Sequence, residues 1–135
     1  MKKYYLHYNN FSKETIKAIK KMVKEGFYKK DDISKSKNIR DLNNELSSIY
    51  KIKEPEIIFG SKNFSPCYDT INNTIYLTNL SIISFLHEFK HSIQFNKKET
   101  NNEKLARGWS LSLFKQACPI TFKKAVKEGK VFFAN

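Results

Sequence analysis

The segment His87-Glu88-Phe89-Lys90-His91 carries more information than any other part of this chain. Residues four apart on an α-helix lie on one face, about one turn from each other, so the two histidines can direct their imidazoles at one metal ion. Glu88 projects beside them, where a carboxylate can take a proton from water held by the metal. If the segment is helical, this H-E-x-x-H pattern predicts a zinc site of the hydrolytic type.

The surrounding residues predict a helix from Ser81 to about Asn96. The stretch contains no Gly or Pro, and Ser81 is a good N-cap residue. His87 and His91 fall roughly 140–180° around this helix from Ile82, so we expect them to lie off its main apolar stripe. That stripe follows the three- and four-residue spacing of a buried helix face: Ile82, Phe85, Leu86, Phe89 and Ile93.

A lone buried histidine is more often a hydrogen-bonded core residue than a metal ligand. Here two of the chain's 3 histidines are four residues apart with a glutamate between them, which favours metal binding. A catalytic zinc needs a third protein ligand and one position left for water. The candidates are Glu99, Glu103, Asp69 and His7.

Glu103 is the third ligand that we favour. It opens a helix predicted from about Asn102 to Ala117, far enough beyond His91 for the chain to turn back. Small residues on the same face, Ala106 and Ser110, allow close packing against another helix. The alternative is that Glu103 is only a favourable charge at the positive end of the helix dipole.

The rest of the chain predicts an α+β fold in which one domain spans residues 1–135. The expected elements are a helix between Ser12 and Gly26, a loop over Lys29–Lys37, a helix from Ile39 to Tyr50, a strand over Glu56–Phe59, and an antiparallel hairpin of Cys67–Ile71 and Thr74–Thr78. Two helices therefore precede a small antiparallel sheet, and the H-E-x-x-H helix and a glutamate-bearing helix follow it.

Composition limits the function classes. No apolar run matches a membrane span or a signal peptide, and two cysteines do not make a disulfide scaffold, so we expect a cytoplasmic protein with no membrane partner. The net charge of +12 comes from 25 basic residues, of which only Arg40 and Arg107 are arginines. Because the lysines are dispersed along the chain, we expect nucleic-acid binding to be weak and non-specific, if it occurs at all.

The segment from His87 to His91, followed by Glu103-x-x-Ala106 on the next helix, resembles the gluzincin branch of zinc metallopeptidases. The order of elements is most similar to the small IrrE/ImmA-like domains of bacteria, phages and mobile elements. The resemblance, specific over about residues 74–117, implies a minimal zincin-like fold. It also implies that Thr74–Thr78 is an edge strand for an extended substrate. Lys90 occupies a position where such motifs usually carry a small residue, and it either projects towards the site or extends to solvent.

The resemblance implies that His87, His91 and Glu103 bind Zn²⁺ and that Glu88 is the general base of a peptidase acting on a protein or peptide. Arg107, Tyr68 and Tyr76 are candidates for stabilising the oxyanion, and Arg107 is equally a candidate for orienting Glu103. Two other readings remain open. One is a non-catalytic, zincin-like protein that acts by contact with a host protein or nucleic acid. The other is a structural metal site closed by a fourth ligand.

Overall fold

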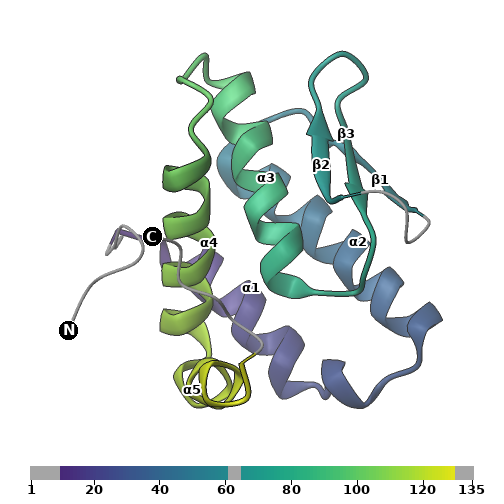
Figure 1. Ribbon diagram of the computed structural model, residues 1–135, viewed down its shortest axis with the longest axis vertical. Helices are drawn as coiled ribbons and strands as arrows, with labels where there is room; N and C mark the ends of the chain where they lie inside the picture. The colour runs from purple at the N-terminus through teal and green to yellow at the C-terminus, as the bar shows by residue number, and fades with distance from the viewer. Residues whose placement is uncertain (1–9, 61–64, 130–135) are drawn as a thin grey trace.

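The N-terminal half of the chain forms two helices, as the sequence predicts. The computed structural model describes residues 10–60 and 65–129. In chain order its elements are α1 (Lys13–Lys24), the short 3-10 helix η1 (Phe27–Lys29), α2 (Asp32–Tyr50), β1 (Glu56–Phe59), β2 (Cys67–Asp69), β3 (Thr74–Leu77), α3 (Ile82–Asn96), α4 (Glu103–Ala117) and α5 (Pro119–Lys127) (Figure 1). The α+β class is confirmed at this level.

Most predicted helix limits are confirmed because local capping groups set them. The Ser12 hydroxyl accepts a hydrogen bond from the Thr15 amide at 3.2 Å, and Gly26 follows α1 with a left-handed φ of 86°. The predicted loop over Lys29–Lys37 is wrong. Helix α2 begins at Asp32, where the carboxylate of Asp31 caps the Ser34 amide at 2.8 Å. The first turns of α2 contain one apolar residue, Ile33, which is 83% exposed, so apolar spacing does not reveal them.

The sheet is mixed, which corrects the prediction of an antiparallel sheet. Strand β2 pairs antiparallel with β3, as the predicted hairpin requires, and Asn73 in the turn has a φ of 50°. Strand β1, however, pairs parallel with the other side of β3, so the strand order is β1-β3-β2. Thr74–Leu77 is therefore the central strand, and the implied edge strand at Thr74–Thr78 is wrong. Helix α3 contacts β2 and β3, and of these two strands β2 is the one at the edge of the sheet.

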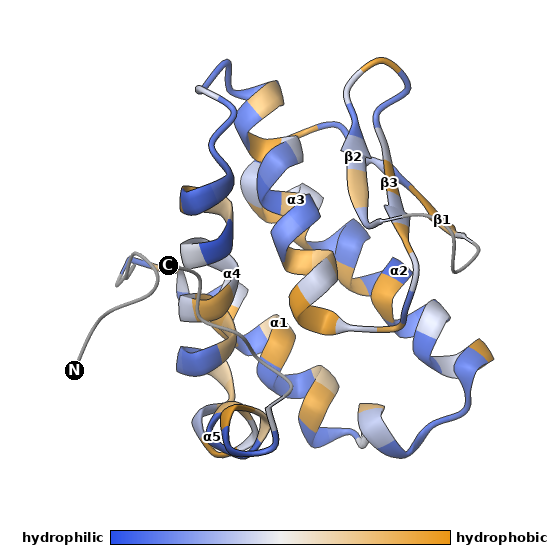
Figure 2. Ribbon diagram, viewed as in Figure 1, coloured by the Kyte–Doolittle hydropathy of each residue, from blue (hydrophilic) through white to orange (hydrophobic). Residues whose placement is uncertain are grey.

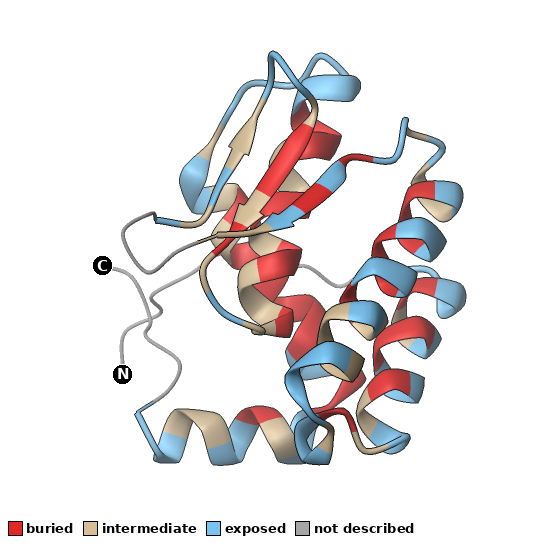
Figure 3. Ribbon diagram, turned by 90° about the vertical axis from the view of Figure 1, so that its right-hand side faces the viewer, coloured by how far each residue is buried: buried red, intermediate tan, exposed pale blue. Residues whose placement is uncertain are grey.

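Helix α3 lies between the sheet and α4, with contacts to α2, α4, β2 and β3. Figure 3 shows buried residues on the central strand and on the inward sides of the helices around it. Phe85, Leu86 and Phe89 are fully buried in a single apolar cluster that also contains Ile75. The other helices alternate between hydrophobic and hydrophilic residues along their length, as burial on one side requires (Figure 2). The site helix is therefore held from several directions.

Helix α5 was not predicted. The last predicted helix ends at Ala117, and Pro119 occupies the first turn of a further one. Phe122 of α5 is buried against Phe114 of α4, with ring centroids 6.4 Å apart. Among the helices in the described part of the chain, none has the length and apolar character needed to cross a membrane.

Candidate metal centre

Helix α3 presents His87 and His91 together on one face. The Ser81 hydroxyl accepts a hydrogen bond from the Ser84 amide at 3.1 Å, which fixes the start of the helix where the sequence predicts it. The two imidazole rings are half-buried, and their centroids are 5.0 Å apart. As expected, both lie off the stripe of fully buried apolar residues. One helix therefore supplies two ring nitrogens at the spacing that a single ion requires.

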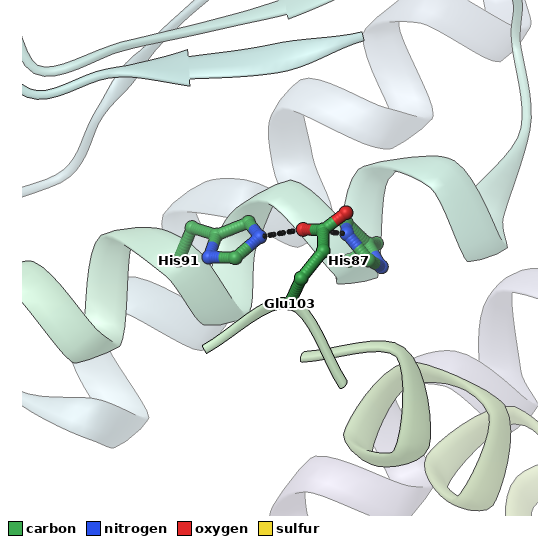
Figure 4. Close-up of side chains that lie close together, drawn as sticks. All are labelled: His87, His91 and Glu103. Carbon is green, nitrogen blue, oxygen red and sulfur yellow. Dashed lines mark hydrogen bonds and ion pairs between the residues drawn. The ribbon is translucent and has the colours of Figure 1, made fainter. Parts of the chain in front are cut away.

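Glu103, the first residue of α4, points at both histidines (Figure 4). Its Oε1 atom lies 2.8 Å from Nε2 of His87 and 2.5 Å from Nε2 of His91. Close packing of α4 against α3 makes this possible, and fully buried Ala106 and Ser110 lie one and two turns beyond Glu103. The side chain of Asn102 caps the Leu105 amide at 2.9 Å and so fixes where α4 begins. The predicted small-residue face is confirmed.

The ligand atoms of His87, His91 and Glu103 all lie within 4.8 Å of one another. Tetrahedral zinc with bonds of about 2.0–2.2 Å holds its ligand atoms roughly 3.3 Å apart. The two short contacts must therefore open by less than about 1 Å to admit an ion. The Glu103 side chain is 64% exposed and can make that movement. Within residues 10–60 and 65–129, no fourth His, Cys, Asp or Glu joins this group.

Gln94 determines which nitrogen of His91 is available. The Asn102 amide donates to Gln94 Oε1 at 3.3 Å, and Gln94 Nε2 donates to the Asn102 carbonyl at 3.1 Å, so the backbone sets the orientation of the Gln94 amide. Oε1 then lies 2.8 Å from Nδ1 of His91 and can only accept from it. The proton of neutral His91 is therefore on Nδ1, which leaves the Nε2 lone pair directed at Glu103.

Such a lone pair beside a carboxylate oxygen repels it unless a proton or a metal cation lies between them. Burial lowers the pKa of His87 despite the neighbouring Glu103, which favours the neutral imidazole that metals bind. Burial opposes ionisation of Glu103, but the neighbouring His87 and His91 outweigh it and lower the pKa of the carboxyl group. Two imidazoles and one carboxylate form a donor set that fits Zn²⁺.

Glu88 is not one of the three residues that could hold an ion, but it lies beside them in a cleft. The cleft has a volume of about 440 Å³, and Glu88, His91 and Glu103 line it. Glu88 is only 7% exposed. Burial raises the pKa of Glu88 to about 7, and the nearby Glu103 adds to that effect while His91 opposes it. A carboxyl group that titrates near neutrality is suited to exchanging protons with water.

Comparison with protein-family models, with curated proteins and with solved structures gives no match. The likeness to gluzincins therefore rests on the residues and on this geometry alone.

The other candidates for the third ligand lie elsewhere. Glu99 lines the cleft but pairs with Lys90 at 3.8 Å. Asp69 accepts hydrogen bonds from the Ile71 amide at 2.9 Å and the Asn72 side chain at 2.8 Å, so it stabilises the β2–β3 turn. His7 lies outside the described residues.

The candidates for oxyanion stabilisation occupy three different settings. Tyr68 lines the cleft, and its hydroxyl donates to Asn73 Oδ1 at 2.6 Å, away from the histidines. Tyr76 alternates with fully buried Ile75 on β3 and so projects from the opposite face of the sheet. Arg107 is close enough to His87 for its charge to lower the pKa of that residue, but it does not line the cleft. Of the three, only Tyr68 lines the cleft.

Lys90 turns away from the metal-binding group. Its ammonium lies 5.6 Å from the centre of the Trp109 ring and 3.8 Å from Glu99, and its side chain is largely buried. Burial lowers the pKa of Lys90, while Glu99 opposes that change. The aromatic ring and the carboxylate thus account for a lysine where a small residue was expected.

Gln94 is a residue of this site that the sequence pattern did not reveal. Replacing Gln94 tests its role. Gln94→Leu preserves the size of this 2% exposed side chain but removes the acceptor for His91 Nδ1. We expect zinc affinity to fall about 10- to 100-fold, the usual effect of removing a partner that orients a ligand. Competition with a chromogenic chelator, well below the melting temperature, measures this. Asn96→Ala is the matched control, because Asn96 donates to the Ser92 carbonyl on the same helix at 2.7 Å and interacts with Tyr68 rather than with His91. Equal losses in both variants would contradict the role given to Gln94.

Burial of Glu88 predicts how pH affects the metal-free protein. Its pKa is about 7 when folded and 4.5 ordinarily, so the folded state holds a proton that the unfolded chain releases between these values. The free energy of unfolding therefore falls as pH rises from 4.5 through 7. Metal-free Glu88→Gln should be more stable than wild type at pH 8, by roughly 1–3 kcal/mol after allowance for solvent screening, and equally stable near pH 4. Urea unfolding in chelator at both pH values measures the difference, and a difference independent of pH would contradict the prediction.

Proposed function

We propose that this protein is a zinc-dependent metallopeptidase. The observation that carries the proposal is the convergence of His87, His91 and Glu103, with the buried carboxyl group of Glu88 in the adjoining cleft. Three protein ligands leave a coordination position for water or substrate, as in catalytic zinc sites.

In this mechanism His87, His91 and Glu103 hold the ion, and Gln94 keeps the Nε2 atom of His91 directed at it. When bound, zinc lowers the pKa of water towards 7 and polarises a carbonyl group. Glu88 accepts the proton of the attacking water and returns it to the departing amine. Burial, which raises the pKa of this carboxyl group in the metal-free protein, makes it a stronger base than an exposed glutamate.

Strand β2 supports a peptide as the substrate. It is an edge strand whose residues Cys67 and Tyr68 line the cleft that contains Glu88. Its outer edge offers backbone groups with which an extended chain can pair. We therefore assign to β2 the role of edge strand for an extended substrate, which the resemblance had implied for β3.

Two further functions compete with this one. A structural zinc site needs a fourth protein ligand, and none joins the group in residues 10–60 and 65–129. A zincin-like protein that binds a partner without cleaving it needs no general base. The burial of Glu88 beside the ligands favours catalysis over that second alternative.

Mapping of new peptide termini tests the proposal. Zinc-loaded wild type and zinc-loaded Glu88→Gln are incubated with a bacterial proteome, and new N-termini are labelled and identified. We expect termini that appear with wild type, disappear in chelator and are absent with Glu88→Gln. Full zinc occupancy without such termini, across several proteomes, would favour the non-catalytic binding protein.

A further inference from the structure

The end of the cleft beyond His91 is aromatic. Phe95 lies four residues after His91 on α3, about 6 Å further along the helix axis. It lines the same cleft as His91 and Glu88, yet 52% of it is exposed. The ring of Tyr68 from β2 faces it, with centroids 6.3 Å apart. We call Phe95, Tyr68 and the neighbouring Pro66 the aromatic wall.

Separate contacts hold in place the strand and the helix that carry the two rings of the aromatic wall. The Tyr68 hydroxyl is bonded to Asn73, and its strand pairs with β3. Phe95 is in the last turn of α3, where the Lys97 amide donates to the Ile93 carbonyl at 2.8 Å and the Lys98 amide donates to the Phe95 carbonyl at 3.2 Å. The backbone that carries both rings is therefore fixed before any ligand arrives, which limits the conformational entropy lost when the rings are covered.

The charge of the cleft limits what can cover the wall. Three of the lining residues are glutamates, Glu88, Glu99 and Glu103, and no described lysine or arginine lines it. Although the protein has a net charge of +12, the carboxylates are the only permanently charged side chains among the described residues that line the cleft, and Lys90 pairs with one of them, Glu99, at 3.8 Å. Electrostatic complementarity favours neutral or basic ligands and disfavours acidic ones.

We propose that the aromatic wall is a specificity subsite that binds an aromatic or large aliphatic side chain of an extended, non-acidic peptide, next to the bond that faces the metal site. Successive residues of an extended chain are about 3.3–3.4 Å apart. The wall is therefore within reach of a side chain one or two residues from that bond. This inference rests on the proposed function in one respect, that the ligand is a peptide substrate.

Peptide binding without turnover tests the proposal. The probes are three capped, dye-labelled octapeptides of Gly, Ser and Lys residues that carry phenylalanine, alanine or glutamate at one central position. Fluorescence anisotropy measures their Kd for the Glu88→Gln protein with zinc and again in chelator, so that the wall is separated from the metal. We expect the phenylalanine peptide to bind about tenfold more tightly than the alanine peptide, and the glutamate peptide to bind weakest.

Variants then test whether the aromatic wall causes the preference for phenylalanine. Phe95→Ser should reduce the preference for phenylalanine over alanine to about twofold or less, and Phe95→Leu should restore most of it. Ile120→Ser is the matched control, because Ile120 is 85% exposed on α5 and does not line the cleft. That variant should keep the tenfold preference.

The outcomes separate this inference from the proposed function. A phenylalanine preference that depends on Phe95, in a protein that cleaves nothing, supports the subsite and overturns the peptidase. Equal Kd values for all three peptides, a preference unchanged in Phe95→Ser, or no binding at millimolar concentration overturns the subsite, whatever the protein cleaves.

Discussion

Glu88→Gln is expected to bind zinc as wild type does and to turn over substrate about 10² to 10⁴ times more slowly, the usual contribution of general base catalysis. Glu88 is not one of the three converging ligands, so the amide should leave the metal in place. Glutamine has the shape of glutamate but cannot accept a proton from water. The effect should therefore appear in kcat, with zinc content unchanged.

The measurement pairs the zinc stoichiometry of the purified protein with kcat on a peptide identified by terminus mapping. Glu45→Gln, which removes an exposed carboxylate on α2, is the control and should behave as wild type. Loss of zinc from Glu88→Gln would mean that Glu88 helps to hold the ion. Turnover within tenfold of wild type would mean that another group is the base.

Removal of zinc is expected to lower the melting temperature of wild type by about 10 °C or more. An ion that binds only the folded state stabilises it by about 4 kcal/mol when present at a thousandfold excess over its Kd. For a chain of this size that corresponds to a shift of this order. The physical reason is that Glu103 and the two histidines join α3 to the start of α4.

Two variants locate the ion in this experiment. Glu103→Ala should lose zinc, keep its helical circular dichroism and melt at the same temperature with and without chelator. Glu99→Ala removes the carboxylate of the neighbouring candidate and should keep zinc and the chelator effect. The reverse pattern would make Glu99 the ligand, and identical melting of wild type with and without zinc would exclude a stabilising site here.

The sequence predicted that His87, His91 and Glu103 lie together, because most determinants of this arrangement are local. The cap at Ser81, the four-residue spacing of His87 and His91 and the small residues after Glu103 all act within a few turns of helix. Only the contact between α3 and α4 is non-local. It could be predicted because a catalytic zinc site requires a third ligand, and Glu103 was the best candidate.

The pairing of strands could not be predicted in the same way. A hairpin reveals its own pairing through its turn, but nothing within Glu56–Phe59 specifies that β1 adds parallel to β3. Gln94 was missed for a related reason. It stands in a polar run after His91, and its partners include the backbone of Asn102, which carries no signal of its own in the sequence.

The position of Glu103 at the first residue of α4 has a consequence for the rate of metal exchange. Helix ends open far more often than helix centres, and the whole fold need not unfold when they do. One ligand can therefore swing away with the first turn of α4 while both histidines stay fixed on α3. If these three residues hold an ion, we expect its lifetime to depend on the Asn102 cap and the Gln94 bonds more than on the global stability of the protein.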